Sequence, residues 1–294
     1  MDKIQEHTVS VDNQLRLPDY LIGIFDELPT KSSIKKAIKA GKVSINDQIA
    51  RTADIPTKDQ VISLSEIDQQ INPYPLALEI CYEDEHLLIV NKPAGLPTSG
   101  NYFRTLTAAL AHTHPQPATN GMLHSPKPVH RLDSLTSGLV IAAKTTRARY
   151  LLGQQFETGQ IRKTYQALVM GKTPESGQIE KEIDGKPATT TYEKCVEIRS
   201  LKNEYLTLIR LQPTTGRTHQ LRIHCAEAGF PIYGDPLYAK NTIRNKGLFL
   251  SAVRLQFQHP VTNEDMDIQI DLPSKYLNRM RNEHQRWQRN YGNR

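Results

Sequence analysis

The sequence has few of the features that mark membrane, secreted or zinc-bound proteins. It contains only three cysteines among 294 residues, at positions 81, 195 and 225. Because these are widely separated, they provide neither a disulfide framework nor paired ligands for a structural zinc. No run of about twenty apolar residues could span a membrane, and the N-terminus carries no apolar signal segment. The sequence therefore predicts a globular cytoplasmic protein with reduced thiols.

Glycine-rich phosphate-binding motifs are also missing. The chain has no P-loop and no G-x-G-x-x-G, so no nucleotide cofactor is indicated. Ser137 lacks the G-x-S-x-G context of a serine hydrolase. The histidines between 112 and 124 have no metal-ligand spacing, and His219 and His224 are five residues apart rather than four. We therefore expect a reaction that uses neither a cofactor nor a metal.

Positive charge is concentrated in two segments. The net charge is +6, and residues 274–294 hold six Lys and Arg against one acid, Glu283. Five further lysines lie between 31 and 42 with no acid among them, and four of them, at 31, 35, 39 and 42, follow a helical course. A lysine stripe is most often a solvated helix face, but together the two clusters favour a polyanionic partner, RNA. The five lysines are Lys31, Lys35, Lys36, Lys39 and Lys42.

Three segments follow a loose arm predicted at residues 1–11. They are a compact unit at 12–68, a main domain at 76–273 and a basic helix at 274–294, with a proline-bearing linker at 68–75. Part of the first unit, residues 16–64, resembles the small alpha-L RNA-binding fold of a ribosomal small-subunit protein. The likeness lies in Thr30–Ser33, the helix to Ile38, and Lys39–Asn46. It implies that Lys35 and Lys39 meet RNA phosphates.

The main domain alternates irregularly between strand and helix patterns. Apolar runs such as 87–90 and 139–143 predict strands, whereas 105–111 and 145–156 predict helices. We expect a loop at 112–127, a helix opening near 215 and a last helix from 274 to about 289. Because βα units do not repeat, the fold class is α+β, with a mixed, mainly antiparallel sheet flanked by helices.

Chemistry-bearing residues gather in four polar stretches outside the predicted core, at 90–97, 130–138, 162–165 and 214–224. In the second stretch, Asp133 follows Arg131 by two residues. A nearby cation favours an ionised carboxylate, which in a cleft can act as a nucleophile or a base. In isolation, such a pair would more simply be a structural ion pair.

Tyr165 and several basic side chains complete the candidate site. A strand tyrosine is usually a core residue, yet extruded bases commonly stack on an aromatic ring. An arginine at hydrogen-bonding distance would hold the Asp133 carboxylate charged and oriented. Such a site needs no cofactor if the reaction rearranges a nucleotide. The basic groups are Arg131, Lys163, Arg217 and Arg222.

The four stretches together resemble the RluA-type family of pseudouridine synthases. Residues 130–138 fit its pattern H-R-L-D-x-x-T-S-G, and 217–224 fit R-x-x-Q-x-R-x-H. The likeness covers residues 76–272 with the motifs in order. The remaining matches are Asn91–Gly95, Lys163-x-Tyr165 with Ala167, Val169 and Gly171, Gly234–Tyr238, and His259-Pro260. Ser251 departs from the family, whose members often carry histidine there, and we expect it to shape the pocket wall.

This resemblance implies the pseudouridine synthase fold and the isomerisation of uridine to pseudouridine in RNA. Asp133 would attack the ribose, abstract a sugar proton or add to the base. Tyr165 would stack on the uracil, Arg222 would pair with Asp133, and Arg131 would enter the space that the uridine leaves. The other expected RNA contacts are His130, Lys92, Lys163, Arg217, His219, Gln220, Lys35 and Lys39.

The RNA itself is less well defined by the sequence. The basic N-terminal unit favours large-subunit ribosomal RNA, with transfer RNA as the second choice, and we expect a monomer. A non-catalytic RNA-binding factor and a metal-free RNA hydrolase are the alternatives. The first would bind RNA without forming pseudouridine, and the second would cleave the strand.

Overall fold

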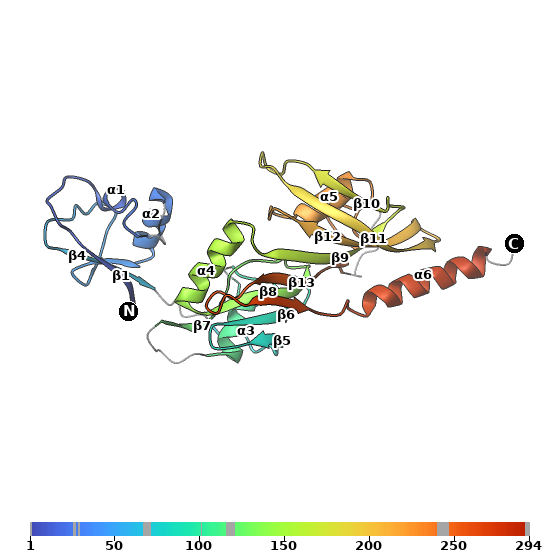
Figure 1. Cartoon of the computed structure of the whole chain (residues 1–294), viewed down its shortest axis with the longest axis horizontal. Helices are drawn as coiled ribbons and strands as arrows, with labels where there is room; N and C mark the ends of the chain where they lie inside the picture. Colours follow the sequence, from blue (N-terminus) through green and yellow to red (C-terminus); the bar gives the residue numbers. More distant parts are fainter. Residues whose placement is uncertain are drawn as a thin grey trace. The chain divides into compact units, whose positions relative to one another are not determined.

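The chain folds into two compact units, Met1–Ile71 and Asn72–Arg294 (Figure 1). The computed structural model describes residues 2–25, 28, 30–66, 72–100, 102–115, 121–239 and 247–291. The boundary falls within the predicted linker, whose residues 68–71 lie outside the described ranges. None of the described helices is long and apolar enough to cross a membrane.

The N-terminal unit packs two helices against a four-stranded antiparallel sheet. Helix α2 begins as predicted, because Thr30 and Ser33 cap each other's backbone N–H groups. It buries Ile34, Ala37 and Ile38 against the sheet. The sheet order is β1 (Asp2–Thr8), β4 (Val61–Glu66), β2 (Val43–Ile45) and β3 (Gln48–Ile49), and the helices are α1 (Leu17–Tyr20) and α2 (Lys31–Lys39).

The prediction of a loose arm at residues 1–11 is wrong. Residues 2–8 form strand β1, which pairs antiparallel with β4, and Val9 is fully buried. The polar sequence of this strand shows no alternation of apolar side chains. Strand β1 is held in the sheet by backbone pairing with β4. This pairing does not depend on apolar side chains, so a hydrophobic pattern does not predict it.

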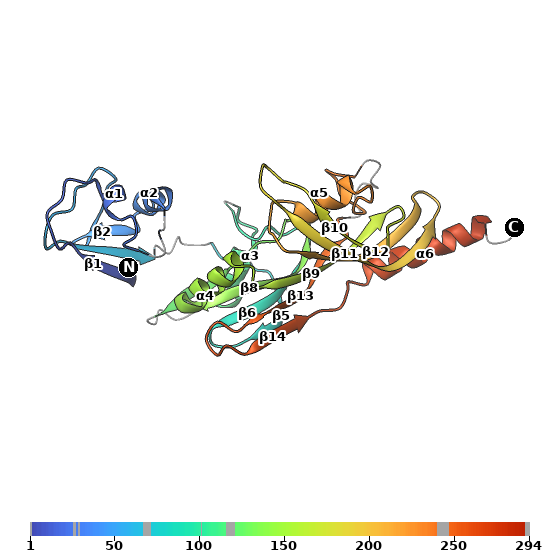
Figure 2. The same ribbon diagram turned by 45° about the horizontal axis from the view of Figure 1, so that its top comes forward.

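The C-terminal unit is built on a ten-stranded sheet (Figure 2). Its order is β10-β11-β12-β9-β13-β8-β6-β5, with β14 beside β13 and β7 beside β8. Strands β13 and β8 run parallel, and the other named pairs are antiparallel. This confirms the predicted mixed, mainly antiparallel sheet. The strands are β5 (Glu79–Glu83), β6 (Leu87–Lys92), β7 (Met122–Pro128), β8 (Ser137–Thr145), β9 (Arg162–Met170), β10 (Ser176–Glu180), β11 (Thr189–Ser200), β12 (Glu204–Pro213), β13 (Leu250–Gln258) and β14 (Asp265–Gln269).

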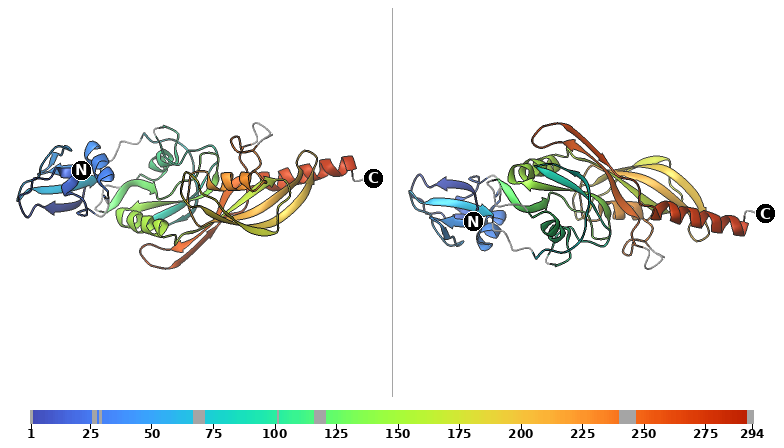
Figure 3. Two further views of the ribbon diagram at one scale, coloured as in Figure 1. Left: turned by 90° about the horizontal axis from the view of Figure 1, so that it is seen from above. Right: turned by 90° about the horizontal axis from the view of Figure 1, so that it is seen from below.

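Helices cover both faces of this sheet (Figure 3). Leu88 and Val90 of β6 pack with α3 (Leu106–Thr113) and α5 (Gln220–Glu227) on one face. Leu87 and Ile89 point the other way, toward α4 (Thr146–Glu157). Helix α6 (Lys275–Tyr291) packs on strands β9 and β12 through Tyr276 and other apolar side chains. Burial on both faces explains the unbroken apolar runs of β6 and β8.

Two segment boundaries differ from the sequence prediction. Part of the expected loop at 112–127 is strand β7, and residues 116–120 lie outside the described ranges. Helix α5 starts at Gln220 rather than near 215, because His219 has a left-handed backbone with φ of 55°. Residues 214–219 therefore form a loop at the edge of the cleft described below.

Gly138 is required where β8 meets β13. Its φ is +115°, and a Cβ there would lie 2.1 Å from the carbonyl oxygen of Ala252. Gly138→Ala is therefore expected to destabilise the unit by about 3 kcal/mol or more. Fluorescence-detected unfolding measures this unit alone, because Trp287, the single tryptophan, lies in α6.

Gly153 provides the matched control for Gly138→Ala. It lies inside α4, and a Cβ there would meet nothing within 4 Å. Gly153→Ala should raise the stability by about 0.5–1 kcal/mol. Equal effects of the two alanines would contradict the close approach of β8 and β13.

Candidate active site

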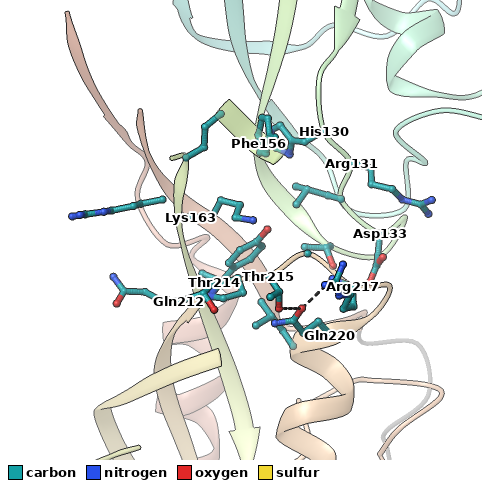
Figure 4. Close-up of a pocket in the computed structure, with 18 of the residues that line it drawn as sticks. His130, Arg131, Asp133, Phe156, Lys163, Gln212, Thr214, Thr215, Arg217 and Gln220 are labelled. Atoms are coloured by element: carbon teal, nitrogen blue, oxygen red, sulfur yellow. Dashed lines mark hydrogen bonds between the residues drawn. The ribbon is translucent and has the colours of Figure 1, made fainter. Parts of the chain in front are cut away.

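A cleft of about 890 Å³ opens beside strands β9 and β12. Its walls come from the loop before β8, the start of β9, and the loop that leads into α5. Figure 4 shows His130, Phe156 and Lys163 at one end and Asp133, Arg217 and Gln220 at the other. The structure thus brings three of the four predicted polar stretches into one cleft.

Asp133 lies in the loop between β7 and β8, and its side chain is 19% exposed. The loop is fixed from the side by the segment after β6. The hydroxyl of Thr98 donates to the Leu132 carbonyl and accepts from its N–H, and the N–H of Gly95 donates to the Ser134 carbonyl. These bonds hold the carboxylate at the cleft wall.

Arg222 joins two carboxylates inside the protein. Its Nη1 lies 3.5 Å from Asp133 Oδ2, while Nε and Nη2 donate to both oxygens of Asp235 at 2.8 and 2.9 Å. The predicted pairing with Asp133 is therefore present but secondary. Burial alone would lower the pKa of Arg222, but the bonds and charge of Asp235 outweigh it and raise that pKa. The guanidinium stays charged beside the cleft.

His219, at the end of the loop before α5, is a second basic side chain that approaches Asp133. Its Nε2 lies 3.8 Å from Asp133 Oδ2, and its Nδ1 lies 2.9 Å from the Tyr238 hydroxyl. The Tyr238 ring also receives the Arg222 guanidinium at 5.1 Å. Tyr238 thus contacts both basic side chains that approach the carboxylate, His219 and Arg222, and helps to orient them.

Tyr165 lies in β9 and lines the cleft, with 9% of the residue exposed. Burial raises the pKa of its phenol, and the negative charge of Asp133 adds to the effect. The phenol is therefore protonated at neutral pH. Its position fits a side chain that packs against a planar ligand and donates a hydrogen bond.

Comparison with known proteins identifies the class of this site. A family model described as RNA pseudouridylate synthase matches residues 86–227. The chain is 33% identical to ribosomal large subunit pseudouridine synthase D of Neisseria meningitidis, over 87% of this chain and 73% of that protein. The enzyme of the same name in Escherichia coli is 31% identical over 90% of each chain. The chain belongs to the RNA pseudouridylate synthase family.

The solved structures agree with this assignment. Human RNA pseudouridylate synthase domain containing 4 is 25% identical, with a TM-score of 0.57, over 69% of this chain and 93% of that one. Human RNA pseudouridylate synthase domain containing 1 gives the same identity and TM-score over 68% and 86%. The synthase therefore has the fold and the enzyme class that the motifs predicted.

His130 and Lys163 line the end of the cleft that is distant from Asp133. His130 Nε2 accepts the N–H of Ile141, and its ring lies 4.7 Å from that of Phe156. Burial, aided by the charge of Lys163, lowers the pKa of His130 to about 3. A neutral imidazole bound to the backbone supports the loop, so it does not serve as a cation for RNA.

Arg131 and Arg217 occupy the rim. Arg131 is exposed, and Arg217 is half-buried with Nε donating to the Pro187 carbonyl at 3.1 Å. Both line the cleft and keep charged N–H groups available to a ligand. Their positions are compatible with the predicted RNA contacts.

Gln220 corrects one predicted RNA contact. Its Oε1 accepts from the Thr215 hydroxyl and the Arg217 N–H, and its Nε2 donates to the Thr189 carbonyl and the Thr190 hydroxyl. An amide has two donors and two acceptor positions, and all four are used. Gln220 therefore shapes the loop in front of α5 and has no group left for RNA.

Lys92 is a second correction, because it is fully buried and does not line the cleft. Its Nζ donates to the carbonyls of Pro93, Leu96 and Ser134 at 3.0, 2.7 and 3.3 Å. Burial lowers its pKa to about 8, against the opposing charge of Asp133. Lys92 thus ties the segment after β6 to the Asp133 loop.

The lowered pKa of Lys92 gives a pH-dependent stability with a defined sign. Between its folded pKa of about 8 and its ordinary value of 10.5, the unfolded chain holds the proton and the folded chain does not. Stability therefore rises with pH in this window, by up to about 1.4 kcal/mol per unit. Lys92→Met should lack this rise when Trp287 fluorescence follows unfolding between pH 8 and 9.5.

Lys58 offers the control for that experiment, because it is an exposed lysine in the N-terminal unit. Lys58→Met should leave the pH slope of the C-terminal unit unchanged. Identical slopes for Lys92→Met and the unchanged protein would contradict the assigned burial of the ammonium group.

Sequence reasoning missed Asp235 and Tyr238 as site residues. Asp235 is fully buried and accepts from Arg222 and from the N–H groups of Leu237 and Tyr238. Both residues belong to the Gly234–Tyr238 motif, which provided the signal.

Ser251 does not line the cleft, contrary to expectation. Its buried hydroxyl lies 2.6 Å from Ser137 Oγ and 3.0 Å from Tyr276 Oη, which links β8, β13 and α6.

Lys35 and Lys39 are exposed on α2 of the N-terminal unit, so they are not part of the cleft wall. In the described part of the chain, no group of three or more His, Cys, Asp or Glu side chains is arranged to hold a metal ion.

Proposed function

We propose that this synthase converts uridine to pseudouridine in large-subunit ribosomal RNA, with Asp133 as the catalytic residue. The observation that carries the proposal is the Asp133 carboxylate at the cleft wall, 3.5 Å from the Arg222 guanidinium, with Tyr165 in the same cleft. The names of the relatives, ribosomal large subunit pseudouridine synthase D, support this RNA class.

The reaction requires only rearrangement of the nucleotide. The bond between N1 and C1′ breaks, the uracil turns, and a bond between C5 and C1′ forms. The proton on C5 is lost and N1 gains one, so no oxidant or cofactor is consumed. Asp133 acts as the nucleophile or base, and Arg222 fixes its orientation. A cleft of about 890 Å³ has room for an extruded nucleoside to turn.

Extrusion of the uridine costs a few kcal/mol of stacking and pairing. Tyr165 offers an aromatic surface to the extruded base, which replaces part of the lost stacking. Arg131 stands exposed at the rim, where it would enter the space that the base leaves. Lys163 and Arg217 add positive charge that attracts the phosphates near the target.

The N-terminal unit is proposed to hold RNA as an alpha-L type domain. Lys35, Lys36 and Lys39 are exposed along α2, while its apolar side is buried. Such a helix face binds phosphates without reading sequence. We propose further that the synthase is a cytoplasmic monomer, in line with its free cysteines.

The test uses transcripts that carry tritium on C5 of uridine. Release of tritium from a large-subunit ribosomal RNA transcript, with no release from transfer RNA, is the expected result. Release from transfer RNA alone would overturn the proposed RNA class. A denaturing gel should show the RNA at full length, because a hydrolase would shorten it.

A further inference from the structure

Helix α6 carries positive charge that the catalytic cleft does not use. Its single acid, Glu283, is buried and already bound to Ser200, with Arg279 and Arg286 at 3.2 and 3.5 Å. Arg281 and Arg289 are exposed and eight residues apart, so they lie on the same side of the helix. The charge of these two arginines is therefore directed to solvent.

The inward side of α6 is firmly packed. Tyr276 and Met280 are buried in a core cluster with β9 and β12, and Arg279 lies over the Tyr233 ring at 5.2 Å. Lys275 Nζ donates to the Leu248 carbonyl. These contacts fix the rotation of the helix, so Arg281 and Arg289 are presented at a constant spacing of about 12 Å.

Cations and aromatic rings from neighbouring strands extend this surface. Arg199, near the end of β11, lies over the rings of Tyr205 and Trp287 at 4.3 and 5.9 Å. Lys172 lies 5.7 Å from the Tyr205 ring, and Lys202 is exposed in the β11–β12 turn. Figures 1 and 3 show the C-terminal half of α6 projecting beyond this turn.

Charge decides which partner fits. We define the α6 surface as Arg281, Arg286, Arg289, Arg199, Lys202 and Lys172, all of them exposed. The turn contributes one exposed acid, Glu204. The large exposed apolar side chains of α6, Leu277 and Tyr291, are fourteen residues apart, about 21 Å along the helix. In the turn, Leu201 is 37% exposed beside Lys202. Positive charge therefore dominates this surface, which suits the phosphates of RNA better than an apolar partner.

The α6 surface is distant from the cleft. Thr191 of β11 lines the cleft, and Arg199 lies eight residues further along the same strand. At about 3.3 Å per residue, this separation is about 26 Å. That length corresponds to roughly seven or eight stacked nucleotides at about 3.4 Å each. Only an RNA that extends well beyond the target uridine can reach both places.

We propose that the α6 surface is a second RNA-binding surface, which holds the phosphate backbone of the substrate about 26 Å from the cleft wall at Thr191. The proposal rests on the proposed function, because it takes the substrate to be a long structured RNA. The surface contributes affinity and orientation without reading bases.

The test compares two RNAs that contain the same target uridine. One is a short oligonucleotide with three neighbours on each side, and the other adds a duplex of about twenty base pairs. In Arg281→Glu/Arg289→Glu, KM for the long RNA should rise about tenfold, with kcat unchanged. KM for the short RNA should stay the same. The salt dependence of long-RNA binding should weaken by one to two units of log K against log salt.

Matched variants separate charge from folding. Arg281→Lys/Arg289→Lys keeps the charge, and Lys, Arg and Glu have similar helix propensities. It should bind both RNAs like the unchanged protein. Lys202 lies in the β11–β12 turn and not on α6, and Lys202→Glu should also raise KM for the long RNA. Trp287 fluorescence verifies that α6 is still packed.

Three results would overturn the proposal. The first is an unchanged KM for the long RNA in Arg281→Glu/Arg289→Glu. The second is a rise in KM in this variant that is equally large for the short and the long RNA. The third is a rise in KM for the long RNA in Arg281→Lys/Arg289→Lys that is as large as in the glutamate variant. Failure of the unchanged protein to convert either RNA would instead overturn the proposed function, and this surface with it.

Discussion

Asp133→Asn is expected to lower the rate of pseudouridine formation by about 10³-fold or more. The amide keeps the shape of the side chain but is neither a nucleophile nor a useful base. The bonds from Thr98, Gly95 and Thr136 engage backbone atoms of the Asp133 loop and not its carboxylate, so they persist in the variant. RNA binding should therefore change by less than about threefold, because the phosphate contacts are intact. Single-turnover tritium release and equilibrium RNA binding measure the two quantities.

Asp265→Asn is the matched control for that experiment. Asp265 is an exposed carboxylate at the start of β14, which does not line the cleft. Its amide variant should react at the normal rate. If Asp133→Asn reacted as fast as Asp265→Asn, Asp133 would take no part in the reaction and the proposed mechanism would be wrong.

Asp235→Asn is expected to destabilise the C-terminal unit by about 3 kcal/mol or more. The carboxylate and Arg222 are both buried, so loss of the negative charge leaves a guanidinium without its main counter-charge. Hydrogen bonds from Arg222 and from two N–H groups lower the pKa of Asp235 despite its burial, so the charge is present at neutral pH. Activity should fall too, because Arg222 is then no longer held in place beside Asp133.

The pair of Arg254 and Asp267 provides the comparison. It has the same two-bond geometry, but its side chains are 39% and 48% exposed. Asp267→Asn should cost less than about 1 kcal/mol, because solvent screens the pair. Unfolding by denaturant, followed through Trp287 fluorescence, measures both variants. If both variants lost the same free energy of unfolding, burial would not make the Arg222–Asp235 pair more important for stability than the exposed pair.

Much of the fold could be predicted from local patterns. The apolar runs of β6 and β8 and the cap at Thr30 specify their elements directly, because each depends on neighbouring residues. Strand β1 could not be predicted in this way, because its partner β4 lies about sixty residues further along the chain. The late start of α5 depends on one backbone angle at His219, which no pattern specifies.

The sequence predicted which residues form the site better than it predicted which of them contact each other. The motifs brought Asp133, Tyr165 and Arg222 into one region, as the structure does. They do not tell which carboxylate holds Arg222 more closely, because Asp235 and Asp133 compete through geometry alone. Likewise, the sequence predicts that Lys92 contacts RNA because it is a lysine in a motif. Its burial, which excludes this contact, is visible only in the structure.

The role of Asp133 is tested most directly by the structure of Asp133→Asn bound to its substrate RNA. We expect an unstacked uridine in the cleft, with its base against Tyr165 and its ribose beside residue 133. A target uridine still stacked in the RNA helix, with the cleft unfilled, would contradict the assignment of this cleft as the active site.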